Sequence, residues 1–135
     1  MIRQSQIALA ALTYWAAVFA FAFVLGIGRT LWLAPQIGAL AAVLCEVPLT
    51  LAASWWAARR LTARFGIASR GEALGMGLIA FVLLMAAEVT LARMLSGQSP
   101  AQWLRAQTSA AGAAGLAGQV LFALMPWWVF SSAPR

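Results

Sequence analysis

The sequence predicts an all-α fold, a bundle of four transmembrane helices in a polytopic membrane protein. The first observation is composition: 64% of the 135 residues are hydrophobic and only 9% are charged, whereas soluble domains carry about 25% charged residues. The second is the presence of four apolar runs. Each is long enough to cross about 30 Å of hydrocarbon at about 1.5 Å per residue. The length fits a single membrane domain over residues 1–135.

The four predicted spans follow one another with few polar interruptions. They run from about Ile7 to Leu33, Ile37 to Ala58, Ala73 to Leu95, and Ala111 to Phe130. The first run exceeds the apolar core of a cleavable signal peptide, which is about 7–15 residues long. We therefore expect it to be retained as a span.

Short connections join the spans. We expect Ala34-Pro35-Gln36 to link the first pair, residues 59–72 the second pair, and residues 96–110 the last pair. In the last connection Ser99 and Pro100 suit the start of a helix, because serine caps free N–H groups and proline fits the first helical position. Residues 101–106 then form either a short helix lying in the interface or an irregular polar loop.

The arginines predict the orientation. With the N-terminus inside, six arginines lie on the cytoplasmic side and three outside, and the positive-inside rule favours this arrangement. We therefore expect a bacterial inner-membrane protein with both termini in the cytoplasm. The inner set is Arg3, Arg59, Arg60, Arg64, Arg70 and Arg135, and the outer set is Arg29, Arg93 and Arg105.

Lipids are the first expected partner. Arg59, Arg60, Arg64 and Arg70 should contact anionic headgroups of the cytoplasmic leaflet. Most of the tryptophans fall near span ends, as in the aromatic belt of membrane proteins. A pI near 11.7 is also typical of nucleic-acid-binding proteins. Here, however, the cations flank apolar runs, so we expect no nucleic-acid partner.

The chain lacks the residues of common enzyme and metal sites. It has one cysteine, no histidine and no aspartate. Ser-His-Asp and Cys-His catalytic groups are therefore excluded, and the usual zinc, iron–sulfur and haem sites lack ligands. We expect no enzymatic activity, no cofactor and no metal.

Four polar residues fall within or beside the spans at similar depth. By counting residues, Glu46, Glu88 and Gln119 lie roughly 10–14 Å below the outer boundary, and Arg29 lies near that boundary on the first span. Because an ionisable group in hydrocarbon is costly, we expect these residues to form one polar cluster inside the bundle. Pro48 should kink the second span beside Glu46.

Two interpretations of the glutamates remain open. In the structural one, Arg29 neutralises a glutamate and locks the bundle. Arg93 lies about 140° round the helix from Glu88 and is a poor partner for it. In the functional one, a buried glutamate exchanges a proton for a substrate. A glutamate without a cation would favour transport, and a neutralised cluster would favour a structural role.

Small residues predict where helices approach closely. Gly112, Gly115 and Gly118 recur in the fourth span, and glycine lets backbones pack tightly in lipid. The alternative is that this row reflects only a composition rich in alanine and glycine.

Several motifs resemble a group of uncharacterised four-span proteins from proteobacteria. They are Gly28-Arg29-Thr30-Leu31-Trp32-Leu33-Ala34-Pro35, Glu46-Val47-Pro48, Ser54-Trp55, Leu116-Ala117-Gly118-Gln119 and Phe122-Ala123-Leu124. The resemblance covers most of the chain and implies a four-span fold and an inner-membrane location. Size and helix number are also similar to those of small multidrug-resistance transporters. That family keeps its essential glutamate in the first span, where this chain has none.

These observations lead to two expectations for function. The first is an accessory or structural bundle that acts through lipids, a larger membrane-protein partner or a second copy of itself. The rival is a proton-linked small-molecule transporter that works as an oligomer and uses the buried glutamates.

Overall fold

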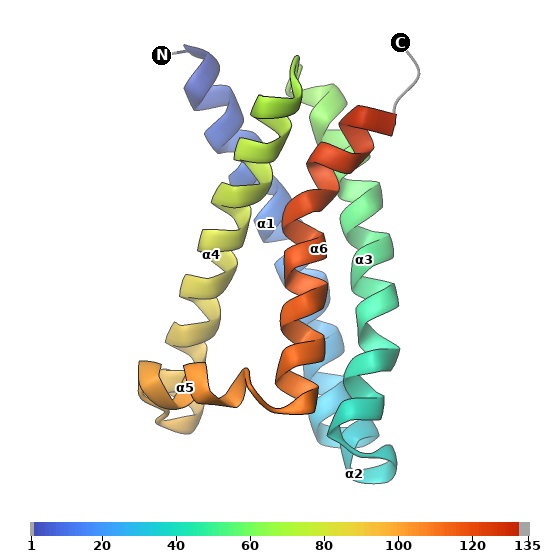
Figure 1. Ribbon diagram of the computed structural model, residues 1–135, viewed down its shortest axis with the longest axis vertical. Coiled ribbons are helices and arrows are strands. Elements are labelled where there is room, and N and C mark those ends of the chain that lie inside the picture. The colour runs from blue at the N-terminus through green and yellow to red at the C-terminus, as the bar shows by residue number, and fades with distance from the viewer. Residues whose placement is uncertain (1, 133–135) are drawn as a thin grey trace.

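The computed structural model describes residues 2–132, and among these residues there are helices and no strands. Four long helices form the bundle: α1 (Ile2–Gly28), α3 (Ala39–Arg64), α4 (Arg70–Ser96) and α6 (Ala110–Ser132) (Figure 1). The predicted all-α class is therefore confirmed. α1 begins and α6 ends at the same end of the bundle, as an even number of passes requires.

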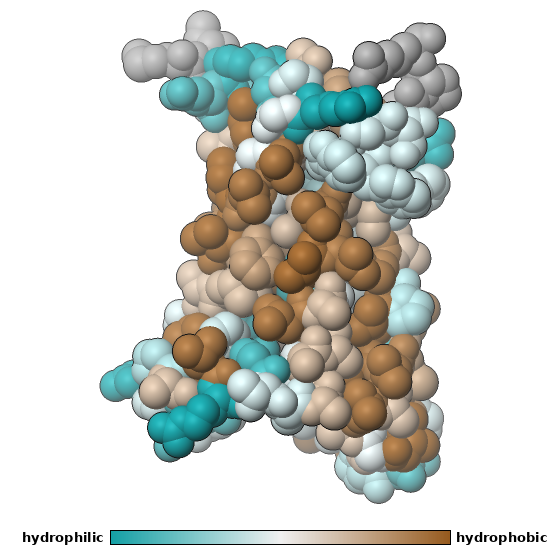
Figure 2. Space-filling model, viewed as in Figure 1, coloured by the Kyte–Doolittle hydropathy of each residue, from teal (hydrophilic) through white to brown (hydrophobic). Residues whose placement is uncertain are grey.

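Each long helix is long and apolar enough to cross a membrane, the first as a continuous stretch over Arg3–Ile37. Large apolar side chains such as Leu44, Val82 and Leu121 are exposed on their outer faces. On the face shown in Figure 2, apolar side chains cover the middle of the molecule and polar ones gather towards both ends. A surface with so large an apolar area is suited to a nonpolar solvent.

The first helix extends beyond its predicted end. The wider π-helical turn η1 (Arg29–Leu33) and the short helix α2 (Ala34–Ile37) continue it directly. The chain reverses at Gly38, whose φ of 90° favours glycine. The expected connection Ala34-Pro35-Gln36 is therefore helical, because proline is tolerated in the first turn of a helix.

The connection between α3 and α4 is also shorter than expected. α3 continues through Arg59, Arg60 and Arg64, and α4 begins at Arg70. Gly66, with a φ of 64°, ends α3 in a turn where the N–H of Ile67 donates to the carbonyl of Thr62. The last turns of α3 extend beyond the apolar part of the helix, so Arg59, Arg60 and Arg64 are part of the helix and not of a loop.

One ion pair joins the start of α1 to the first turn of α4, next to this connection. Arg3 Nε donates to Glu72 Oε1 at 2.6 Å, and a second guanidinium nitrogen contacts Glu72 Oε2 and the carbonyl of Gly66. The same carboxylate accepts the N–H of Ala68 at 2.7 Å. This pair was not predicted from the sequence, although Ser69 and Glu72 have the spacing of a helix cap.

The last connection contains the short helix α5 (Pro100–Ala106), not an irregular loop. Ser99 and Gln102 form a reciprocal capping box at its start. α5 lies across the end of the bundle opposite to the start of α1 (Figure 1). Leu104 and Arg105 are exposed, and Trp103 is half-buried.

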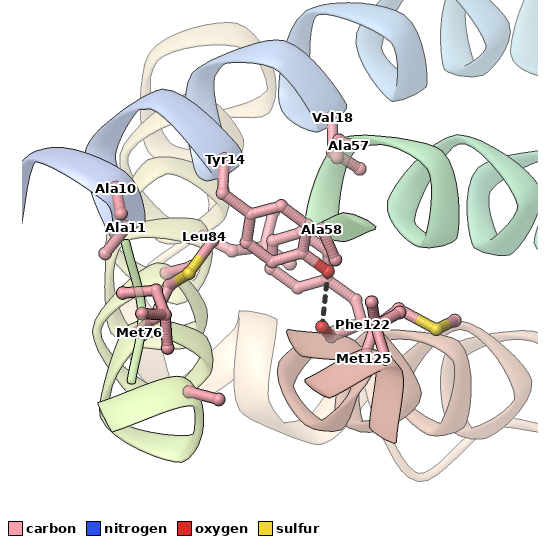
Figure 3. Packing of buried hydrophobic residues seen from close by; sticks show 14 residues of the cluster. Ala10, Ala11, Tyr14, Val18, Ala57, Ala58, Met76, Leu84, Phe122 and Met125 are labelled. Atoms are coloured by element: carbon pink, nitrogen blue, oxygen red, sulfur yellow. Dashed lines mark hydrogen bonds between the residues drawn. The ribbon is translucent and has the colours of Figure 1, made fainter. Parts of the chain in front are cut away.

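The tightly packed part of the bundle lies between its middle and the end where α1 begins. Tyr14 is fully buried there; it stacks on Phe122 with ring centroids 4.6 Å apart and donates a hydrogen bond to the Phe122 carbonyl at 2.6 Å (Figure 3). A Cβ on Gly77 would overlap the backbone carbonyl of Ala123, so α4 and α6 are in backbone contact. Met76, Ser54 and Pro126 are the other largest fully buried side chains.

Candidate functional site

A cavity of about 390 Å³ occupies the half of the bundle near α2 and α5. Residues from α1, η1, α3, α4 and α6 line it, and residues of α5 and its connection to α6 reach its edge. Its polar lining residues are Arg29, Glu46, Thr50, Glu88, Gln107, Ser109 and Gln119. The four residues predicted to form a polar cluster, Arg29, Glu46, Glu88 and Gln119, thus all line the same cavity.

Arg29 of η1 and Glu46 of α3 form an ion pair that borders the cavity. Arg29 Nε lies against Glu46 Oε2, and the Arg29 and Glu46 side chains are 34% and 17% exposed. Arg29 is the first residue of η1, where the helix changes to the wider π turn. Its guanidinium folds back along α1, since a Cβ on Gly26 would lie 3.5 Å from an Arg29 nitrogen. The pair neutralises one of the two glutamates in the cavity.

Glu88 has a different environment. Its Oε1 accepts a hydrogen bond from Gln119 Nε2 of α6. Among residues 2–132, no ion pair to Glu88 is formed, and the only arginine on the cavity wall, Arg29, contacts Glu46. Glu88 is therefore held by a neutral amide, and the two glutamates have different partners.

Gln119 leaves one polar atom unsatisfied. While its Nε2 donates to Glu88, its Oε1 is buried and accepts no hydrogen bond within the described chain. A buried acceptor without a donor is unfavourable. The atom has almost no accessible surface, so a molecule in the cavity reaches this acceptor only when the Gln119 side chain turns towards it.

Arg93 and Pro48 lie outside this arrangement. Arg93 is exposed on α4 and does not line the cavity, as its position round the helix from Glu88 predicts. Pro48 lies inside α3 with its side chain exposed, and α3 continues as a helix on both sides of it. It removes the helical N–H donor to the carbonyl of Leu44, while its neighbours Glu46 and Val47 line the cavity.

The glycine row of α6 has mixed roles. A Cβ on Gly118 would lie 3.2 Å from the methyl groups of Val47, so this glycine brings α6 close to α3. A Cβ on Gly112 would overlap the backbone of Ala106. At Gly115, an added Cβ would meet nothing within 4 Å, and this residue lines the cavity. On α6, Gly112 and Gly118 therefore allow close contacts with neighbouring segments, and Gly115 leaves space in the cavity.

A layer of packed side chains separates the cavity from the opposite end of the bundle. Val18, Leu84 and Phe122 are buried and also line the cavity. Tyr14 lies against Phe122 on the side of the packed core (Figure 3). This layer was not predicted from the sequence. The available signals were the single tyrosine within the first span and Pro126 within the fourth.

The arginines predicted to contact lipid lie at the end where α3 finishes and α4 begins. Arg59, Arg60, Arg64 and Arg70 are all exposed. The guanidinium carbons of Arg59 and Arg60 lie 5.3 Å from the ring centroids of Trp55 and Trp56, respectively. Cation–π contacts at this distance hold the charges beside amphipathic aromatic rings.

No family model, curated protein or solved structure matches the chain.

Proposed function

We propose that the protein is embedded in a bacterial inner membrane, with both termini in the cytoplasm. Four helices of sufficient length and an apolar outer surface support this placement. At the proposed cytoplasmic end, the exposed arginines Arg59, Arg60, Arg64 and Arg70 would lie against anionic lipid headgroups. The cavity then opens towards the periplasmic half of the bilayer.

We further propose that the protein is a proton-linked transporter of a small molecule, with Glu88 as the proton-exchanging group. The observation that carries this proposal is that Glu88 forms no ion pair among residues 2–132, whereas Arg29 is paired with Glu46. An uncompensated carboxylate in hydrocarbon is costly, and such groups become neutral by taking up a proton. Glu88 can therefore alternate between a protonated form and a form that binds substrate.

The packed layer closes the cavity at one end, so it must open for transport. The cavity ends at Val18, Leu84 and Phe122, so passage across the bilayer needs the contacts between Tyr14 and α6 to open. A bundle of four helices has few internal surfaces on which such a movement can occur. We therefore propose that the working unit is a homo-oligomer, in which a second copy supports the exposed apolar faces as the layer opens.

The test uses purified protein in liposomes with an imposed pH gradient, exposed to a mixture of water-soluble and amphipathic bacterial metabolites. We expect wild-type vesicles to accumulate at least one compound, detected by mass spectrometry, in a manner that depends on the gradient. Glu88→Gln should abolish accumulation. Arg93→Gln changes an exposed residue outside the cavity and should behave as wild type. Identical accumulation in wild-type and Glu88→Gln vesicles would contradict the proposal.

A second function, that of an accessory bundle, is favoured by the Arg29–Glu46 ion pair and by the backbone contact at Gly77. These features hold helices together without requiring a substrate. The test is purification in mild detergent followed by identification of bound proteins and lipids. A stoichiometric protein partner that is retained by the Glu88→Gln variant would support this function over transport.

A further inference from the structure

The charges on the cavity wall are unequal. Arg29 contributes one positive charge, and Glu46 and Glu88 contribute two negative charges when both are ionised. The three groups then carry one net negative charge, and Glu88 is the carboxylate that forms no ion pair among the described residues. A ligand that binds beside ionised Glu88 must therefore supply a positive charge, since an anion or a neutral molecule would leave this carboxylate uncompensated.

The hydrogen-bonding groups next to Glu88 point to the same chemistry. The Glu88 carboxylate is an acceptor, and Gln119 Oε1 is a buried acceptor without a donor. A group with several N–H donors can satisfy the Glu88 carboxylate and, when the Gln119 side chain turns towards the cavity, Gln119 Oε1 as well. A primary ammonium has three donors and no acceptor, whereas a quaternary ammonium has the charge but no donors.

Much of the remaining wall is apolar. Val18, Phe19, Val47, Leu51, Leu84 and Phe122 contribute hydrocarbon or aromatic surface. The volume of about 390 Å³ lies within the range of small-molecule sites, about 300–1,000 Å³. A ligand that fills this space has an apolar body attached to its cationic group.

We propose that the cavity binds a primary ammonium group carried on an apolar body, with the ammonium held between Glu88 and Gln119 Oε1. Two sources share this chemistry: a soluble amphipathic amine and the headgroup of an aminophospholipid. The proposal rests on the proposed proton exchange at Glu88. Protonated Glu88 releases its proton as the ammonium cation binds, so that one positive charge replaces another and no other reactant is needed.

The first experiment measures binding to the purified protein in detergent by titration calorimetry, with four probes of similar shape. They are phenethylammonium, trimethylphenethylammonium, phenethyl alcohol and hydrocinnamate. We expect phenethylammonium to bind best and the quaternary probe to bind about tenfold more weakly or worse, because it lacks N–H donors to charged and buried acceptors. Buffers of different ionisation enthalpy should show release of about one proton per bound ammonium.

Variants locate the site. Glu88→Gln should abolish the proton release and weaken phenethylammonium binding at least tenfold, and Gln119→Leu should weaken it about tenfold. Arg93→Gln should bind as wild type. The comparison of the four probes on the wild-type protein needs no variant, so it remains decisive if Glu88→Gln fails to fold.

The second experiment distinguishes the two sources. The protein is placed in nanodiscs of phosphatidylethanolamine or of phosphatidylcholine with the same acyl chains, and phenethylammonium is titrated into each. Several-fold weaker apparent binding in phosphatidylethanolamine identifies the lipid headgroup as a competing ligand. Equal affinity in both identifies a soluble amine as the ligand. In both outcomes phenethylammonium binds at the proposed site beside Glu88.

The ammonium proposal is overturned if the alcohol or hydrocinnamate binds as tightly as phenethylammonium, or if none of the probes binds. Such a result leaves proton-linked transport standing when metabolite accumulation still depends on Glu88. If accumulation in liposomes is the same for wild type and Glu88→Gln, the proposed function itself fails.

Discussion

At the level of single residues, Tyr14 supplies a hydrogen bond that Pro126 removes from α6. Proline has no N–H, so the carbonyl of Phe122, four residues earlier in α6, lacks its helical donor. The Tyr14 hydroxyl of α1 donates to this carbonyl at 2.6 Å, and the two rings stack. In a nonpolar surrounding, an unsatisfied carbonyl is unfavourable. The pair therefore joins α1 to α6 through backbone chemistry as well as through packing.

We predict that Tyr14→Phe destabilises the protein by about 1 kcal/mol, because it removes the hydroxyl that donates to the Phe122 carbonyl. In a Pro126→Ala background the same substitution should cost clearly less, since alanine at this position restores the helical N–H. The measurement is a double-mutant cycle from reversible unfolding in mixed micelles. An equal cost in both backgrounds would show that the hydroxyl is not compensating for Pro126.

A second prediction at this scale concerns the Arg29–Glu46 ion pair. Arg29→Ala should destabilise the protein by about 3 kcal/mol, because it leaves a mostly buried carboxylate without its cation. Glu46→Gln should cost less: Arg29 is 34% exposed and its long side chain can move towards the interface, while glutamine keeps the shape of the removed carboxyl. Unfolding of both variants in the same micelles tests the order. A larger loss for Glu46→Gln would contradict it.

The sequence could place the polar residues but could not assign their partners. Counting residues along each span puts Arg29, Glu46, Glu88 and Gln119 at similar depth, and in the structure all four line the same cavity. Which glutamate meets Arg29 depends on the rotation of each helix about its axis. Contacts between helices, such as Gly118 against Val47, determine that rotation. The sequence of one span does not show which residues of another span it will meet.

At the level of helices, the contact between α4 and α6 depends on the absence of a side chain at Gly77. We predict that Gly77→Ala destabilises the protein by about 1–3 kcal/mol, because the new Cβ would overlap the Ala123 carbonyl and force the helices apart. Gly75→Ala is the matched control on the same helix. Its Cβ would meet nothing within 4 Å, so stability should be unchanged or slightly higher. Unfolding in micelles compares the two; an equal loss at both positions would reject the contact as the cause.

Helix boundaries were harder to predict than helix positions. Apolar runs locate the hydrophobic part of each helix, but α3 extends to Arg64 and the first helix extends through Pro35 to Ile37. Charged residues and a proline in a first helical turn are compatible with helix, so composition alone does not end it. Glycines with a positive φ follow the ends of α2, α3 and α4, namely Gly38, Gly66 and Gly97.

At the level of the whole molecule, the bundle is divided into a packed half and a hollow half. Tyr14, Met76 and Pro126 fill the interior on one side of Phe122, while glycines and polar side chains leave space on the other. The packed half holds the four helices together. The hollow half can therefore contain a cavity whose lining has two carboxylates and one arginine. The sequence predicted the bundle but not this division, because it arises from how four helices incline and rotate against one another.

The orientation of the molecule provides the last prediction. We expect both termini in the cytoplasm, because the order of the spans in the sequence assigns six arginines to that side and three to the other; of the six, Arg135 lies outside the described residues. A cytoplasm-only fluorescent reporter fused after Arg135 should be active, and a periplasm-only phosphatase there should be inactive; fusions after Thr108 should show the reverse.

The arginines at the end of α3 should decide this orientation. Changing Arg59, Arg60 and Arg64 to Gln leaves three arginines at each end, so the two reporters should then both be active, in a mixed population. The pairing of Arg3 with Glu72 should not alter the count, since acidic residues contribute little to the positive-inside rule. The matched test is Glu72→Gln, which should leave the wild-type orientation intact. A periplasmic reporter active after Arg135 in the unchanged protein would reverse the proposed orientation and place the cavity at the cytoplasmic side.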